Sequence, residues 1–111
     1  MRCMSDWCSI HATCADREVA TRIAEALIAE RLAACVNIVP GITSIYRWGG
    51  EICKVDEVLL IVKTRGLREQ ACIERIVALH PDRIPGITST RIDQGHPPFL
   101  QWLVDETRKN S

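Results

Sequence analysis

The chain has 111 residues, and its 14 basic and 14 acidic side chains give a net charge of zero at pH 7. This balance excludes the basic footprint of a nucleic-acid binder, and no apolar run approaches the roughly 18 residues of a membrane span. With 47% hydrophobic residues, the sequence predicts a single globular domain over residues 1–111, with a flexible N-terminus over residues 1–6.

The cysteines bear on the compartment in which the protein works. There are six of them, none in a C-x-x-C spacing, and the first residues lack the apolar core of a signal peptide. We therefore expect free thiols in a cytoplasmic protein rather than a disulfide framework.

The first segment predicts a strand followed by a helix. Residues 7–13 alternate in strand fashion, and one side is formed by Cys8, Ile10 and Ala12. Asp16 can cap a helix whose apolar residues recur at helical spacing as far as Leu32.

Residues 35–64 predict one long β-hairpin. It turns at Gly49-Gly50, where two glycines supply the positive φ angles of a two-residue turn. Each arm has about 14 residues and would extend to about 45 Å, so its tip should project from the body. Pro40-Gly41 predicts a bulge in the first arm. In the second arm, residues 58–62 are all apolar, which predicts burial on both faces of the sheet.

The last third predicts a helix, a strand and a second helix. The first helix runs from about Leu67 and stops before Pro81. Its buried stripe is expected to be Cys72, Ile73, Ile76 and Val77. A strand covers about residues 87–92, and Pro97 or Pro98 starts the terminal helix. The residues expected to point inward from that helix are Phe99, Trp102 and Leu103.

This order of elements predicts an α+β fold of the ferredoxin-like type, β-α-β-β-α-β, with an extra C-terminal helix. Helices in this arrangement cover one face of an antiparallel sheet. The apolar run at residues 58–62 requires cover on the other face too, and the open edge of the long hairpin invites association. We therefore expect an obligate small homo-oligomer.

Three residues invite a chemical role beside a structural one. Cys14 lies just before the helix cap, where the helix dipole could favour a thiolate, but a structural thiol is the favoured interpretation. Cys35 is interpreted as a packed core residue, and a role as a metal ligand is the less favoured alternative. His80 ends the second predicted helix, which favours a role at the helix terminus, and metal ligation is the alternative.

Five further residues are candidates for a ligand pocket. Tyr46 and Trp48 share one face of the hairpin near its turn, and packing across strands or subunits is as well favoured as a pocket. Glu57, Lys63 and Thr64 flank the apolar run. If buried they must be paired, either as interface clamps or as pocket residues.

Several motifs recur together in a known family. They are Thr13-Cys14-Ala15-Asp16, the block Glu-Arg-Leu-Ala-Ala-Cys-Val-Asn-Ile-Val-Pro-Gly at residues 30–41, Ser44-Ile45-Tyr46-Arg47-Trp48, Glu57-Val58, Lys63-Thr64 and His80-Pro81. These motifs resemble the CutA family of divalent-cation-tolerance proteins. The resemblance implies a ferredoxin-like protomer in a homotrimer similar to PII-type signalling proteins, with hairpins wrapped around neighbouring subunits.

The resemblance also implies a link to metal-ion tolerance and copper, and no chemical reaction. Copper proposals for the family use a cysteine on the first strand and two histidines before the proline. The aligned residues here are Ala12, Leu79 and His80. The usual His-Pro-Tyr-Glu continuation is also changed, to His-Pro-Asp-Arg at residues 80–83.

The expected function is therefore a non-enzymatic homotrimer that binds copper, another divalent cation or a small ligand in clefts between subunits. The candidate ligand-binding residues are Tyr46, Trp48, Glu57, Lys63 and Thr64, and the candidate metal ligands are His80 and Cys35. A trimeric scaffold that recruits a partner protein is the alternative of another class, and a small enzyme using Cys14 is the third.

Overall fold

The computed structural model describes residues 6–108, so the predicted flexible N-terminus falls almost entirely outside the described residues. The elements in chain order are β1 (Trp7–Cys14), α1 (Arg17–Ala29), β2 (Cys35–Trp48), β3 (Glu51–Arg65), the short 3-10 helix η1 (Gly66–Arg68), α2 (Glu69–Leu79), β4 (Ile87–Arg91) and α3 (Pro97–Glu106). This order confirms the predicted ferredoxin-like α+β fold with an extra C-terminal helix.

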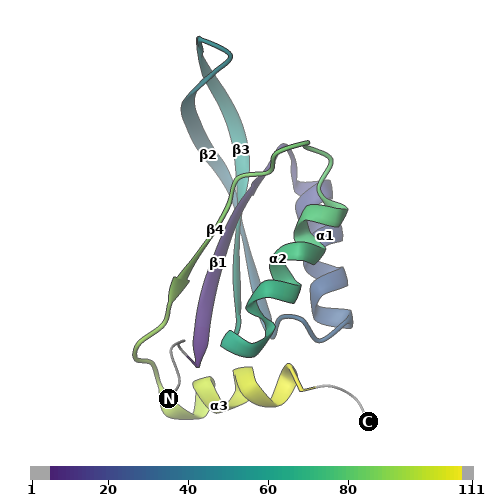
Figure 1. Cartoon of the computed structure of the whole chain (residues 1–111), viewed down its shortest axis with the longest axis vertical. Coiled ribbons are helices and arrows are strands. Elements are labelled where there is room, and N and C mark those ends of the chain that lie inside the picture. Colours follow the sequence, from purple (N-terminus) through teal and green to yellow (C-terminus); the bar gives the residue numbers. More distant parts are fainter. Residues whose placement is uncertain (1–5, 109–111) are drawn as a thin grey trace.

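The four strands form one antiparallel sheet in the order β2-β3-β1-β4. Figure 1 shows α1 and α2 side by side on one face of this sheet, while the β2–β3 hairpin projects well beyond the body. The third helix, α3, lies across the opposite end of the sheet. None of the helices within residues 6–108 is long and apolar enough to cross a membrane.

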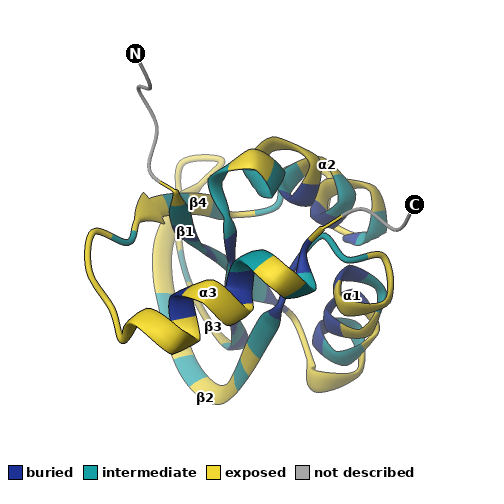
Figure 2. Cartoon of the chain, turned by 90° about the horizontal axis from the view of Figure 1, so that it is seen from below, coloured by how far each residue is buried: buried dark blue, intermediate teal, exposed yellow. Residues whose placement is uncertain are grey.

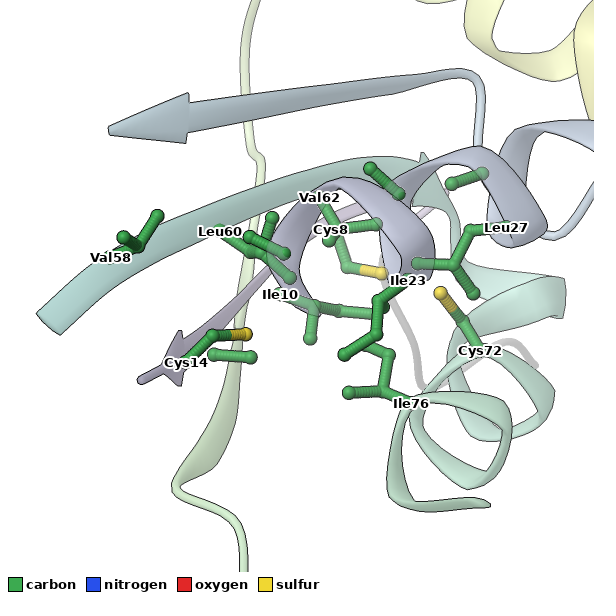
Figure 3. Close-up of a cluster of buried hydrophobic side chains, with 14 residues drawn as sticks. Cys8, Ile10, Cys14, Ile23, Leu27, Val58, Leu60, Val62, Cys72 and Ile76 are labelled. Carbon is green, nitrogen blue, oxygen red and sulfur yellow. The ribbon is translucent and has the colours of Figure 1, made fainter. Parts of the chain in front are cut away.

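The core lies between the sheet and the first two helices. Burial alternates along β1 as predicted, and Cys8, Ile10, Ala12 and Cys14 face the helices. They meet residues at helical spacing on α1 and α2 and the alternate residues of β3 (Figure 3). The buried residues contributed by the helices and β3 include Ile23, Leu27, Cys72, Ile76, Val58, Leu60 and Val62.

The first helix begins where the sequence predicts and ends earlier. The carboxylate of Asp16 accepts a hydrogen bond from the backbone N–H of Val19 at 2.9 Å, which confirms the cap. The helix ends at Ala29 rather than near Leu32, because Arg31 adopts a left-handed conformation with φ 58°. The N–H of Leu32 then returns to the carbonyl of Leu27 at 3.0 Å, and the chain turns toward β2.

The glycines of the hairpin mark its bulge and its turn, as the sequence predicts. The register shifts between Val39 and Ile42, where Gly41 has φ +81°, and this confirms the predicted bulge. Gly49 and Gly50 have φ +60° and +82°, as a two-residue hairpin turn requires. Pairing between β1 and β3 stops at Val58, so residues 51–57 of β3 lie in the projecting part of the hairpin.

The face of the sheet opposite α1 and α2 is only partly covered. Leu59 and Ile61 of β3 point to this face and remain half-buried, between His11 and Thr13 of β1 and the facing residues of β2. The run at residues 58–62 therefore does present apolar side chains to both faces. Within one chain, only the helix-facing side is fully buried.

Two helical orientations differ from the prediction. Val77 of α2 is 48% exposed, so the buried stripe is narrower than expected. On α3, Phe99 and Trp102 point outward and stack on each other at 5.6 Å between ring centres. The inward residues are Leu100 and Leu103, and Figure 2 shows buried and exposed positions alternating around α3.

Candidate functional site

A cleft of about 660 Å³ opens between the hairpin and the loop that joins α2 to β4. The hairpin wall carries Tyr46 and Trp48 from β2 and Cys53 and Glu57 from β3. The opposite wall is the loop at residues 82–86, which begins with Asp82 and Arg83. The site therefore depends on two segments that are distant in sequence.

The hairpin wall is aromatic and open to solvent. Tyr46 is 44% exposed and Trp48 is 60% exposed, and Tyr46 lies directly across the strand pair from Cys53. Glu57 and the two loop residues Asp82 and Arg83 add two carboxylates and one guanidinium. None of these three charged groups forms an ion pair with another residue in the range 6–108. The cleft can thus offer ring faces and free charges to a small ligand.

His80 fixes the loop wall to β1. Its ring is buried, with Nε2 2.8 Å from the carbonyl oxygen of Thr13, and Nδ1 accepts the backbone N–H of Asp82 at 3.0 Å. Because the amide of Asp82 can only donate and the carbonyl of Thr13 can only accept, the neutral ring must carry its proton on Nε2. Both ring nitrogens are therefore engaged within the chain.

The two candidate metal ligands are not brought together. Cys35 pairs with Lys63 at the end of the sheet where β1 begins, near Ser9, whereas His80 contacts the last residues of β1. Residues 6–108 contain no group of three His, Cys, Asp or Glu side chains arranged to hold a metal ion. The described residues of a single chain therefore do not form a copper site, and the metal role of His80 and Cys35 stays a prediction.

Lys63 and Thr64 lie away from the cleft and on opposite faces of the sheet. Lys63 donates from Nζ to the side-chain oxygen of Asn37 at 2.9 Å on the partly covered face. Thr64 is fully buried on the helix side, and its hydroxyl donates to the carbonyl of Leu32 at 2.7 Å. Of the five predicted ligand residues, the structure gathers Tyr46, Trp48 and Glu57 into the cleft and leaves these two outside it.

Cys14 does not meet the needs of a nucleophile. It is fully buried at the edge of the core cluster (Figure 3). Burial, with the negative charges of Glu57 and Asp82, raises the pKa of its thiol to about 11. The buried position and the raised pKa agree with the favoured interpretation of Cys14 as a structural thiol, rather than with the alternative of a thiolate favoured by the helix dipole. The cysteines within residues 6–108 are all free thiols.

Several residues that line the cleft were not predicted from the sequence, among them Asp82, Arg83 and Cys53. Asp82 and Arg83 were noted only as departures from a family motif, and Cys53 was not singled out. The signal that could have found the first two is Pro81, which ends α2 and forces a loop beside the start of β4. Cys53 could have been found from its pairing with Tyr46, since both face the same side of the hairpin.

Comparison with known proteins agrees with this fold. The model of the CutA1 divalent ion tolerance protein family matches residues 8–106. The divalent-cation tolerance protein CutA of Thermus thermophilus is 50% identical over 95 residues, which cover 86% of this chain and 92% of that protein. The crystal structure of CutA from Xylella fastidiosa superposes with a TM-score of 0.91 at 40% identity and covers 94% of this chain and 100% of that chain.

The similarity extends to longer eukaryotic proteins. Human protein CutA is 39% identical over 99 residues, which are 89% of this chain and 55% of the human protein. This chain thus spans little more than half the length of that relative. Because the family model covers most of this chain and bacterial relatives match it nearly end to end, the chain belongs to the CutA1 family of divalent ion tolerance proteins.

Proposed function

We propose that the chain acts without catalysis in tolerance of divalent metal ions, as a homotrimer that binds a metal ion or small ligand in clefts completed by a neighbouring subunit. The observation that carries this proposal is the cleft itself. Its aromatic wall stands on a projecting hairpin, where Tyr46 and Trp48 remain largely open to solvent. One chain supplies only part of an enclosure for a ligand.

The apolar surface of the hairpin supports assembly. Ile45 is 67% exposed and Ile52 is 70% exposed, in addition to Trp48 at 60%. Soluble monomers seldom expose large contiguous apolar patches, and a long open strand edge invites pairing with another chain. On the partly covered face of the sheet, the half-buried Leu59 and Ile61 add further apolar surface. A second and third copy of the chain would cover both regions.

The cysteine thiols support two parts of the proposal, a binding function rather than catalysis and a location in a reducing compartment. The Cys14 thiol is buried with its pKa raised to about 11, which disfavours the thiolate that a nucleophile needs. Free thiols at Cys35 and Cys53 are partly exposed, as suits a cytoplasmic protein.

The test combines mass and binding. Light scattering at micromolar concentration should give three times the 12.5 kDa of one chain, with or without added copper. Calorimetric titration with copper and with zinc should give saturable heat that Trp48→Ala reduces. Folded particles of single-chain mass would overturn the trimer. If neither ion gives saturable heat, the metal version of the proposal fails and a small organic ligand is left.

A further inference from the structure

A second, smaller cleft of about 290 Å³ lies at the end of the molecule opposite the hairpin tip. Its lining consists of Arg65 at the end of β3, Leu67 and Arg68 in η1, and Arg108 just after α3. Figure 2 views this end of the molecule, with α3 in front. Three segments of the chain thus bring three guanidinium groups to one small depression.

The contacts of these arginines hold the cleft together but leave most of their charge unpaired. Arg68 donates from Nε to the carbonyl of Thr107 at 2.8 Å, which fastens η1 to the end of α3. Arg108 lies 3.3 Å from the carboxylate of Asp105, an exposed pair. Within residues 6–108, Arg65 forms neither a hydrogen bond nor an ion pair through its side chain. Among the described residues, the lining of the cleft therefore contains three arginines and no acidic residue.

This excess of positive charge is local. The whole chain has a net charge of zero, so the field in the cleft is not a consequence of a basic protein. A cleft along α1 shows the contrast, because Arg17 and Arg22 are matched there by Glu18 and Glu25. Like charges held close together repel each other unless an anion sits between them.

We propose that Arg65, Arg68 and Arg108 form a binding site for a small multivalent oxyanion, of the kind presented by a phosphate or diphosphate group. The planar fork of a guanidinium matches the oxygens of such a group through paired N–H donors. The leucine in the lining, Leu67, is 73% exposed and leaves the mouth of the cleft open. An anion here would join the end of β3 and η1 to the end of α3.

The experiment is a calorimetric titration of the full chain with inorganic phosphate and with pyrophosphate at low salt. Saturable binding that weakens as sodium chloride is added is the expected result. Arg65→Gln should weaken the binding about tenfold or more, since a hydrogen bond to a charged group is lost. The same variant should abolish the rise in melting temperature that pyrophosphate gives the wild type.

Two further variants make the result decisive. Arg65→Gln should fold normally because its side chain has no partner within the described residues, and Arg108→Gln breaks only an exposed ion pair. Both should weaken binding, while Arg17→Gln in the balanced cleft should not. The proposal is overturned if neither anion binds saturably, if Arg65→Gln binds as the wild type does, or if Arg17→Gln weakens binding equally. None of these results depends on the trimer or on the hairpin cleft.

Discussion

Replacing His80 by alanine separates a structural role from a metal-binding role. The ring is 7% exposed, and its nitrogens join the carbonyl of Thr13 to the amide of Asp82. Alanine removes both part-buried hydrogen bonds and leaves the carbonyl of Thr13 and the amide of Asp82 without these partners. A net hydrogen bond contributes about 1 kcal/mol, and an unsatisfied buried group costs about 1–3 kcal/mol. We therefore expect His80→Ala to lower the free energy of unfolding by about 2–4 kcal/mol.

The assay is urea unfolding of metal-free protein, followed by tryptophan fluorescence at one fixed protein concentration. The concentration must be fixed because stability and assembly are coupled in an oligomer. His96→Ala is the matched control, since His96 is exposed and makes no side-chain cap hydrogen bond at α3. It should change the stability by less than about 0.5 kcal/mol.

Metal provides the contrasting outcome. If His80 acts by anchoring the loop, His80→Ala shows its full loss of stability even when a chelator has removed all metal. Suppose instead that His80→Ala is as stable as the wild type without metal and differs only when copper is added. The interpretation of His80 as an anchor of the loop would then be refuted, and the metal-ligand hypothesis would take its place.

Two other perturbations test the core. Thr64→Val keeps the shape of the buried side chain but removes the hydroxyl that donates a hydrogen bond to the carbonyl of Leu32. The free energy of unfolding should therefore fall by about 1–2 kcal/mol, while metal titrations stay unchanged. A weaker metal titration in this variant would return Thr64 to the ligand-binding residues. Burial raises the thiol pKa of Cys8 and Cys14 to about 11 and that of Cys72 to about 12, from an ordinary value of 9.0. The unfolded chain therefore loses these protons first, and stability should fall as pH rises from 9 toward 11. Urea midpoints measured at pH 8, 9 and 10 check this, and a constant or rising midpoint contradicts it.

The parts of the fold that could be predicted from sequence depend on local rules. Alternating burial in β1 follows from the two-residue period of a strand, and the cap at Asp16 follows from the chemistry of a helix start. The turn at Gly49 and Gly50 requires positive φ angles that few other residues adopt. Each of these signals lies within a few residues of the feature that it predicts.

The orientation of α3 could not be predicted in this way. Its sequence has apolar residues on more than one side, so helical spacing alone leaves the buried side undecided. In the structure, the buried residues of α3 are Leu100 and Leu103. The indole N–H of Trp7 donates a hydrogen bond to the carbonyl of Leu100 at 3.1 Å. That contact joins the start of β1 to α3. The stacked pair Phe99 and Trp102 consequently faces outward.

Only part of the candidate site could be predicted from the sequence. Tyr46 and Trp48 were placed together because residues two apart on a strand share a face. The same rule separates Lys63 from Thr64, which are adjacent and must point to opposite faces, so one chain does not bring them into the cleft together and their ligand-binding role stays a prediction. The environment of Cys14 depends on carboxylates from distant segments, which local patterns do not reveal.

Under the proposed function, the hairpin would connect ligand binding with assembly. Between the turn at Gly49-Gly50 and Val58, β2 and β3 form a two-stranded ribbon that is not paired with β1. Such a ribbon is marginally stable by itself in water, yet it carries Tyr46, Trp48 and Glu57, which form one wall of the cleft. In the proposed trimer, contacts from a neighbouring subunit would order the ribbon and so raise the affinity of the cleft for its ligand. Linkage makes this effect reciprocal, so a ligand in the cleft must strengthen assembly by the same factor. Dilution would therefore weaken ligand binding, and ligand would oppose dissociation on dilution.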